Sequence, residues 1–170
     1  IKDGTTYNTN DYDLQIGGIY LYPSESGVVS TTFHSGSSDI NLTNGMFEIN
    51  DNSNRVNLIT DLISNTITLD NAGFRGSRYV KEEFGHIISL GTPWYYQFGD
   101  YVDRIRELEI KQGNCCQNDP TQLRNNFGNY HISSQKEGVI DSLIVSKSVK
   151  IYPNNNPTIL DLVFSGDNTT

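Results

Sequence analysis

The chain has 170 residues, the size of one large domain or two small ones. Hydrophobic residues make up only 35% of it, but ten Tyr, seven Phe and one Trp need a core to pack against, which argues against disorder. A net charge of −8 disfavours binding to nucleic acid, and no stretch approaches the roughly 20 apolar residues of a membrane span. The chain starts at Ile1 without a signal-peptide pattern, so we expect a processed product.

Short apolar runs between turn formers predict β strands along the whole chain. The runs are rich in Ile, Val, Tyr and Thr, which suit a pleated, half-buried surface. They lie at 19–22, 56–62, 66–69, 138–145, 149–152 and 158–164. Asn44-Gly45 predicts a two-residue hairpin, and residues 101–110 have helical spacing that ends in strand-like alternation. The predicted fold class is therefore all-β, with one short helix at most.

Two sequence patterns recur. A strand, a Tyr-Pro pair and a polar turn follow one another at 19–26 and again at 149–156. The spacing apolar-x-x-apolar-x-apolar occurs at 105–110 and 140–145, with a looser version starting at Val56. These recurrences predict related β units of roughly 35–45 residues.

The middle of the chain carries a more specific pattern. Residues 67–79 (Ile-Thr-Leu-Asp-Asn-Ala-Gly-Phe-Arg-Gly-Ser-Arg-Tyr) are followed by Ser-Leu-Gly at 89–91 and Asp-Arg-Ile at 103–105. This order resembles the Greek-key motif of the βγ-crystallin superfamily, in which Gly76 would end a folded hairpin. The aromatic residue that this family has seven positions before the glycine is Leu69 here, whereas the preceding unit has Tyr20 before Gly27.

The resemblance implies a division of the chain into three parts. Residues 18–111 would form a βγ-crystallin-like Greek-key sandwich of two motifs. Residues 112–170 would form a second, smaller β module that is incomplete on its own, and residues 1–17 an N-terminal arm.

Many members of that family bind calcium through an acidic or amide pair followed two residues later by Ser/Thr-Ser, a set of oxygen ligands that suits a hard cation. Neither motif keeps this pattern, because Arg104, Ile105 and Arg106 follow Asp103. Asp51 and Asn52 lie in a segment rich in oxygen ligands, but such Asn-Asp clusters are more often turns. Asp51, Asn52 and Asp103 are therefore weak calcium candidates. The sequence indicates no other cofactor.

Other candidate sites rest on short patterns. No catalytic motif occurs, so no catalytic residue is assigned. The run Trp94, Tyr95 and Tyr96 can stack on a sugar ring, although such runs more often pack in a core or an interface. Asn41 and Asn168 begin glycosylation acceptor patterns, which fit an extracellular or cell-surface location.

The two cysteines are adjacent, at Cys115 and Cys116. Because the chain has no third cysteine, neither can bridge to a distant part of its own chain. Free thiols, a rare vicinal disulfide and bridges to another molecule all stay open.

The N-terminal arm resembles the end of a β unit. Leu14-x-Ile16 repeats the step Leu143-x-Val145, and Tyr12 precedes it in an Asn-Asp turn. The chain thus looks out of phase with its own repeat, with an unclosed unit at its end, and an unclosed unit leaves an open sheet edge. Tyr12, Leu14 and Ile16 would complete that unit either in the same molecule or in a neighbour, and the second case gives a homo-oligomer or a fibre.

Two functions follow from this sequence. The first is a non-enzymatic extracellular β-structural protein that self-assembles, into a fibre in one form, by exchange of terminal strands. The alternative is a monomeric calcium- or carbohydrate-binding module of the βγ-crystallin type. A secreted hydrolase with an unrecognised site ranks third.

Overall fold

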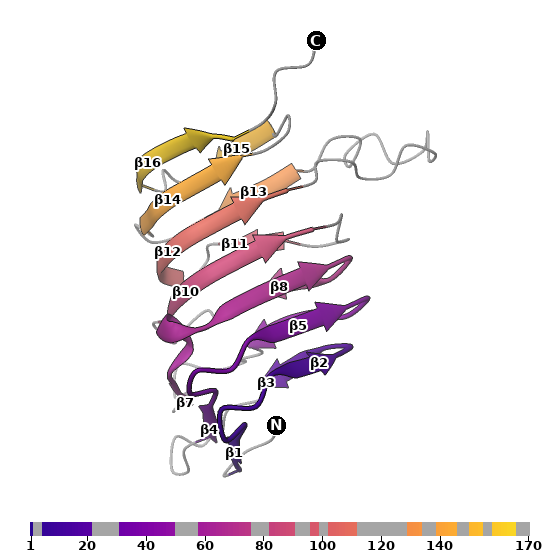
Figure 1. Ribbon diagram of the computed structural model, residues 1–170. Coiled ribbons are helices and arrows are strands. Elements are labelled where there is room, and N and C mark those ends of the chain that lie inside the picture. Colours follow the sequence, from indigo (N-terminus) through magenta and orange to yellow (C-terminus); the bar gives the residue numbers. More distant parts are fainter. Residues whose placement is uncertain are drawn as a thin grey trace.

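The computed structural model describes residues 1, 5–21, 31–49, 58–75, 82–90, 96–98, 102–111, 129–133, 139–145, 150–154 and 158–165. In these residues the chain winds as a coil, and successive turns of the coil stack from the N-terminal to the C-terminal end (Figure 1). Every pair of described strands is parallel. The arrangement is a parallel β-solenoid, in which each turn contacts its neighbours along the stack.

Three sheets run along the coil. The seven-stranded sheet has the order β16-β14-β12-β10-β8-β5-β2, the six-stranded sheet β15-β13-β11-β9-β6-β3, and the three-stranded sheet β1-β4-β7. Their bounds, in chain order, are β1 Thr6–Asn8, β2 Leu14–Ile16, β3 Ile19–Leu21, β4 Thr31–His34, β5 Ile40–Thr43, β6 Met46–Ile49, β7 Leu58–Thr60, a single-turn 3-10 helix η1 Leu62–Ser64, β8 Thr66–Asp70, β9 Gly73–Arg75, β10 Glu82–Ser89, β11 Tyr96–Phe98, β12 Val102–Ile110, β13 Asn129–Ser133, β14 Val139–Val145, β15 Lys150–Asn154 and β16 Thr158–Phe164.

We number the turns of the coil in chain order, and each is defined by the strands it contributes. The first, coil 1, runs from β1 to β3, coil 2 from β4 to β6 and coil 3 from β7 to β9. In the same way coil 4 consists of β10 and β11, coil 5 of β12 and β13, and coil 6 of β14 and β15. The last, coil 7, is represented by β16.

The strand register places the inward side chains of the seven-stranded sheet in continuous columns. One column runs through Leu14, Ile40, Ile67, Ile87, Leu108, Leu143 and Leu162, and a second through Ile16, Leu42, Leu69, Ser89, Ile110, Val145 and Phe164. Between the two ends of the coil these side chains are buried. The spacing apolar-x-x-apolar-x-apolar is the signature of these columns, because 105–110 and 140–145 pair residue for residue in this register.

Aromatic rings fill the space between the sheets in coils 2 to 4. Phe47 of β6 and Phe74 of β9 are stacked with ring centroids 5.4 Å apart. Phe84 of β10 meets both rings edge-on, at 5.9 Å from Phe47 and 5.0 Å from Phe74. All three side chains are fully buried, so this cluster joins strands of the two larger sheets in one core.

Tight turns separate the seven-stranded from the six-stranded sheet. Asn44 and Asn71 adopt left-handed backbone conformations, with φ of 61° and 49°, and Asn71 Nδ2 donates to Asn44 Oδ1 over 2.7 Å. Asn tolerates this conformation better than most residues. A Cβ on Gly45 would collide with the carbonyl oxygen of Gly17, so the turns of coils 1 and 2 stack with no room for a side chain.

The all-β prediction is confirmed, and several finer predictions need correction. Parallel sheets fit a Greek-key sandwich poorly, because that motif is built from antiparallel pairs. Asn44-Gly45 is not a hairpin turn, since β5 and β6 belong to different sheets. Residues 102–110 form the strand β12 rather than a helix, because neighbouring strands pair on both sides.

The predicted repeat length is also wrong. Equivalent positions of coils 1 and 2 are separated by 26 in the sequence, as at Asp13 and Asp39, and those of coils 2 and 3 by 27, as at Asn44 and Asn71. The following steps of the first column, from Ile67 to Ile87 and on to Leu108, are shorter still. The predicted length came from the segments 105–110 and 140–145, and the longest step in the column separates these two segments.

The seven-stranded sheet contains strands from both sides of the domain boundary expected between residues 111 and 112, because β12 pairs directly with β14. Residues 1–17 do not form a separate arm in the described part of the chain, because β1 and β2 are strands of coil 1.

Candidate functional site

Three features of the described residues have the chemistry or the exposure to act as a site. The first is a polar corner between the three-stranded and the seven-stranded sheets, made by Thr9, Ser35, Ser38, Asp61 and Asn65. The second is a charged cluster on the outer face of the seven-stranded sheet. The third is the C-terminal end of the coil, at β16.

Hydrogen bonds between successive coils hold the polar corner together. Thr9 Oγ1 of coil 1 donates to the carbonyl oxygen of Ser35 in coil 2 over 2.9 Å. Asn65 Nδ2 of coil 3 donates back to the carbonyl oxygens of Gly36, over 3.1 Å, and Ser38, over 2.7 Å. Thr9, Ser35, Ser38 and Asn65 are all buried and Gly36 is partly buried, so these bonds satisfy backbone groups to which water has little access.

Asp61 receives several hydrogen bonds at this corner. Its Oδ1 accepts from the backbone N–H and from the hydroxyl of Ser35, both over 2.7 Å, and its Oδ2 accepts from the N–H of Gly36 over 3.2 Å. Partial burial alone would raise the pKa of Asp61. The hydrogen bonds from Ser35 and Gly36, together with nearby His34, outweigh that effect and lower the pKa below its ordinary value.

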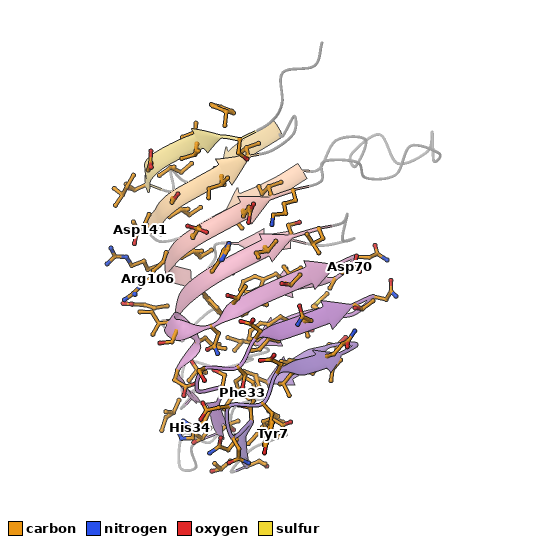
Figure 2. All side chains as sticks on the ribbon, viewed as in Figure 1. Tyr7, Phe33, His34, Asp70, Arg106 and Asp141 are labelled. Carbon is orange, nitrogen blue, oxygen red and sulfur yellow. The ribbon has the colours of Figure 1, made fainter. Side chains whose placement is uncertain are left out.

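His34, Ser35 and Asp61 are the residue types of a nucleophilic triad, so their geometry needs a test. Figure 2 shows His34 near Tyr7 and Phe33 at the N-terminal end of the coil. His34 Nδ1 lies 3.6 Å from Asp61 Oδ2, but the Ser35 hydroxyl bonds to Asp61 and, over 2.6 Å, to Asn65 Oδ1. Ser35 is completely buried, so a substrate cannot reach its hydroxyl. The corner therefore acts as a structural ladder.

The charged cluster lies on the outward positions of coils 4 and 5. His86 Nε2 is 3.0 Å from Glu107 Oε1 and 3.5 Å from Glu109 Oε2, and Lys111 Nζ is 3.2 Å from the same Glu109 oxygen. The nitrogen of His86 is covered from solvent without the angles of a hydrogen bond, so these contacts are close charge pairs once the ring is protonated. Among the described residues no group of three or more His, Cys, Asp or Glu side chains could hold a metal ion.

A separate ion pair lies at the bend of coils 5 and 6. Arg104 Nε donates to both carboxylate oxygens of Asp141, over 3.0 and 2.9 Å, and this raises the pKa of Arg104. Arg106 and Asp141 project from the outer edge of the bend in Figure 2. The Arg104–Asp141 pair links β12 to β14 at the surface.

The C-terminal end of the coil exposes its own core. In coil 6, Leu143 is 0% and Val145 is 6% exposed, because β16 covers them. Their partners in coil 7 occupy the same columns, yet Leu162 is 47% and Phe164 is 76% exposed. No described strand pairs with the second edge of β16. The inward columns thus end at an uncovered apolar surface with an unpaired strand edge beside it, which we call the open end.

The N-terminal end of the coil is closed only in part. Ile16 is 38% exposed, and β2 has an unpaired edge among the described strands. Ile1 packs against the core, and its nitrogen donates to the carbonyl oxygen of Tyr20 in β3 over 2.8 Å. The start of the described chain therefore lies along the edge of the six-stranded sheet.

The predicted assembly residues lie at this N-terminal end. Tyr12 is 75% exposed, while Leu14 and Ile16 belong to β2, which pairs with β5 of the same chain. β2 and β16 lie at opposite ends of the seven-stranded sheet. Of the two alternatives, completion of the last unit by the N-terminal segment of the same molecule is therefore excluded, because the whole stack separates the two strands.

Most other predicted site residues lie outside the described part of the chain: Asp51, Asn52, Trp94, Tyr95, Cys115, Cys116 and Asn168. Asp103 lies on β12, and the backbone of Tyr96 on β11 pairs with Phe74. Asn41 lies on β5 between two buried neighbours, Ile40 and Leu42, so its side chain faces outward from the sheet.

The polar corner and the short repeat of the coil were missed from the sequence, although a signal existed for the repeat. An open sheet edge near the end of the chain was expected, and β16 has one among the described strands. Residues 159–164 carry the same spacing as 105–110 and 140–145, with Ile159, Leu162 and Phe164 in the key places. Residues 84–89 carry its first two places, Phe84 and Ile87, and have Ser89 in the third. Including them would have shown the shorter steps of the repeat. The corner combines single residues from three coils, and no local pattern predicts it.

No protein-family model matches the chain, and neither the curated proteins nor the solved structures yield a match. In the described part of the chain no helix is long and apolar enough to cross a membrane.

Proposed function

We propose that this chain is a non-enzymatic extracellular structural protein that self-associates through the ends of its coil. The observation that carries the proposal is the open end, where Leu162 and Phe164 are exposed although the residues one coil earlier are buried. A strand with an exposed apolar face and an unpaired edge favours contact with another β surface. We propose addition of one coil to another, whereas the sequence suggested exchange of terminal strands.

The regularity of the stack supports a structural role. Two inward columns continue through all the coils of the seven-stranded sheet, and the polar corner ties coils 1 to 3 together. Such a stack forms a stiff rod whose stability rises with the number of coils, because each coil is stabilised by its neighbours. Asn41, which faces outward in an acceptor pattern, supports an extracellular site, since a glycan there would not disturb the core.

The test is the mass of the purified 170-residue chain in solution at several concentrations. We expect sedimentation velocity to show a mass that rises with concentration, and electron microscopy to show end-to-end rods. A folded protein that stays monomeric over the whole range would contradict the proposal. If that monomer bound calcium in a calorimetric titration, or a sugar in a glycan screen, the alternative function as a binding module would replace it.

A further inference from the structure

We propose that Asn44 is a deamidation site that the stacked coils protect, so that the reaction proceeds only while the turn between β5 and β6 is open. Asn44-Gly45 is the one Asn-Gly pair in the 170-residue sequence. The reaction consumes water and releases ammonia. The inference concerns the chemical durability of coil 2, and it does not depend on the proposed function.

The reaction starts at the backbone nitrogen of Gly45. This nitrogen attacks the side-chain carbonyl carbon of Asn44, the Cγ–Nδ2 bond breaks, and the departing ammonia carries away the proton of the former N–H group. Water then opens the resulting five-membered ring at one of its two carbonyl groups and leaves aspartate or isoaspartate. Glycine favours the first step, because it has no Cβ beside the attacking nitrogen and its backbone turns more freely than that of any other residue.

In the folded chain the attacking nitrogen points away from its target. Asn44 has a φ of 61°, which places it in the left-handed region, where ψ is about +47°. With that ψ, the nitrogen of the next residue lies on the opposite side of the Cα–C bond from Cβ. Ring closure needs both atoms on the same side, so the peptide group between Asn44 and Gly45 must first turn through about half a rotation.

Coils 1 and 3 hold this peptide group from both sides. The N–H of Asn44 donates to the carbonyl oxygen of Asp70 over 3.1 Å, and the N–H of Gly73 donates to the carbonyl oxygen of Gly45 over 2.8 Å. On the other side, Gly45 packs so closely on the carbonyl group of Gly17 that a Cβ would not fit. Because the peptide group cannot turn between these contacts, the reaction rate follows the fraction of time that the turn is open.

Asn71 provides a comparison inside the same fold. It has the same left-handed conformation, with a φ of 49°, and its Nδ2 donates to Asn44 Oδ1 over 2.7 Å. The residue after it, Ala72, is fully buried and carries a methyl group beside the attacking nitrogen. The stack therefore protects both asparagines, but only Asn44 is followed by a residue that permits rapid ring closure once the turn opens.

The main product does not fit back into the stack. Isoaspartate adds one atom to the main chain between β5 and β6, and these strands are in register with coil 1 on one side and coil 3 on the other. A longer turn cannot keep both registers and the hydrogen bonds to coil 3. Each reaction therefore removes a molecule from the folded population irreversibly.

The experiment follows deamidation of the full chain by mass spectrometry, with fragment ions that distinguish Asn44 from Asn41 and Asn71. The chain is incubated in mildly alkaline buffer without urea, with sub-denaturing urea and with concentrated urea. Asn65→Ala is the test variant, because it removes the hydrogen bond from coil 3 to Ser38 of coil 2. Asn41→Ala, on the outer face of β5, is the matched control.

We expect Asn44 of the native chain to react about tenfold or more slowly than in concentrated urea, where it should react faster than Asn71. Asn65→Ala should raise the native rate by about tenfold or more, and Asn41→Ala should leave it unchanged. In concentrated urea all three proteins should react at one rate, because the substitutions act only on the folded state. Sub-denaturing urea should raise the rate in the unsubstituted chain, a readout that requires no variant to fold.

Three results would overturn the inference. A native rate equal to that in concentrated urea would show that the stack gives no protection. A native rate that neither Asn65→Ala nor sub-denaturing urea raises would show that the reaction proceeds from the closed stack. Equal rates at Asn44 and Asn71 in concentrated urea would remove Asn44 as the reactive site. None of these results bears on self-association, which sedimentation measures separately.

Discussion

The chain enters the seven-stranded sheet differently in the first three coils and in the later coils. In coils 1 to 3 a separate short strand leads into the polar corner before the chain enters the seven-stranded sheet, and equivalent positions are separated by 26 or 27 in the sequence. In coils 4 to 7 one long strand bends through the same place, and the step from Ile67 to Ile87 is shorter. The inward columns continue unbroken through both regions, so the columns define the fold and the corner is free to vary.

The two regions meet where η1 of coil 3 lies against β10 of coil 4. Gly85 sits at this junction, and a Cβ there would lie 2.6 Å from the carbonyl oxygen of Ile63 and 2.7 Å from that of Asn65. The bend of β10 is thus packed directly on the backbone at the end of the polar corner. From this difference we expect polar contacts to stabilise coils 1 to 3 and close packing to stabilise the later coils.

The largest effect is expected from Asn65→Ala. The substitution removes a donor to the buried carbonyl of Ser38, a donor to the partly buried carbonyl of Gly36 and an acceptor for the Ser35 hydroxyl. It should lower the free energy of unfolding by about 3 kcal/mol. Hydrogen exchange should rise in β4 and β5 but not in β12 or β14, since coils contact only their neighbours. Asn41→Ala, on the outer face of β5, is the matched control and should cost less than about 0.5 kcal/mol. Equal losses in the two variants would show that the hydrogen bonds of Asn65 add no more to the free energy of unfolding than a side chain on the outer face.

Gly85→Ala tests the junction from the other side. The methyl group meets backbone rather than a movable side chain, so we expect a loss of about 1–3 kcal/mol in urea unfolding. Gly17→Ala is the control, because its Cβ would have only Thr43 O as a neighbour, at 3.9 Å. If Gly85→Ala were as stable as the control, η1 would not support the bend.

The sequence predicted the strands better than their arrangement. The apolar-x-x-apolar-x-apolar spacing identified the inward residues of β12 and β14, and Leu14-x-Ile16 was correctly matched with Leu143-x-Val145. The direction of pairing was not predictable, because an inward-outward alternation is the same in parallel and antiparallel sheets. Bonds such as Thr9 to Ser35 and Asn65 to Ser38 join residues 26 and 27 positions apart, and no local pattern reveals them.

The acid response is a smaller effect and concerns the first region only. Because hydrogen bonds lower the pKa of folded Asp61, its ionised form stabilises the fold above the ordinary value of 3.8, and this stability is lost as the pH falls through the lower folded pKa. The urea midpoint should therefore fall more between neutral pH and a pH below that ordinary value in the unsubstituted chain than in Asp61→Asn. Parallel curves for the two proteins would contradict this assignment.

The smallest effect is expected from Asp141→Asn. The Arg104–Asp141 pair is a bifurcated hydrogen bond from one N–H group at the surface, and such pairs add little because water competes for both charges. The thermal midpoint should change within measurement error, and high salt should remove any difference. A clear loss would show that the later coils also depend on polar contacts between strands.

The step between Leu108 and Leu143 has a practical consequence. These residues occupy adjacent places in one column although more of the chain separates them than separates any other two neighbours there, including Leu143 and Leu162. The additional residues enter between β12 and β13, and pairing resumes in register after them, because each strand is positioned by the strand beneath it. A foreign peptide spliced into the chain between β12 and β13 should therefore leave the register of the columns unchanged.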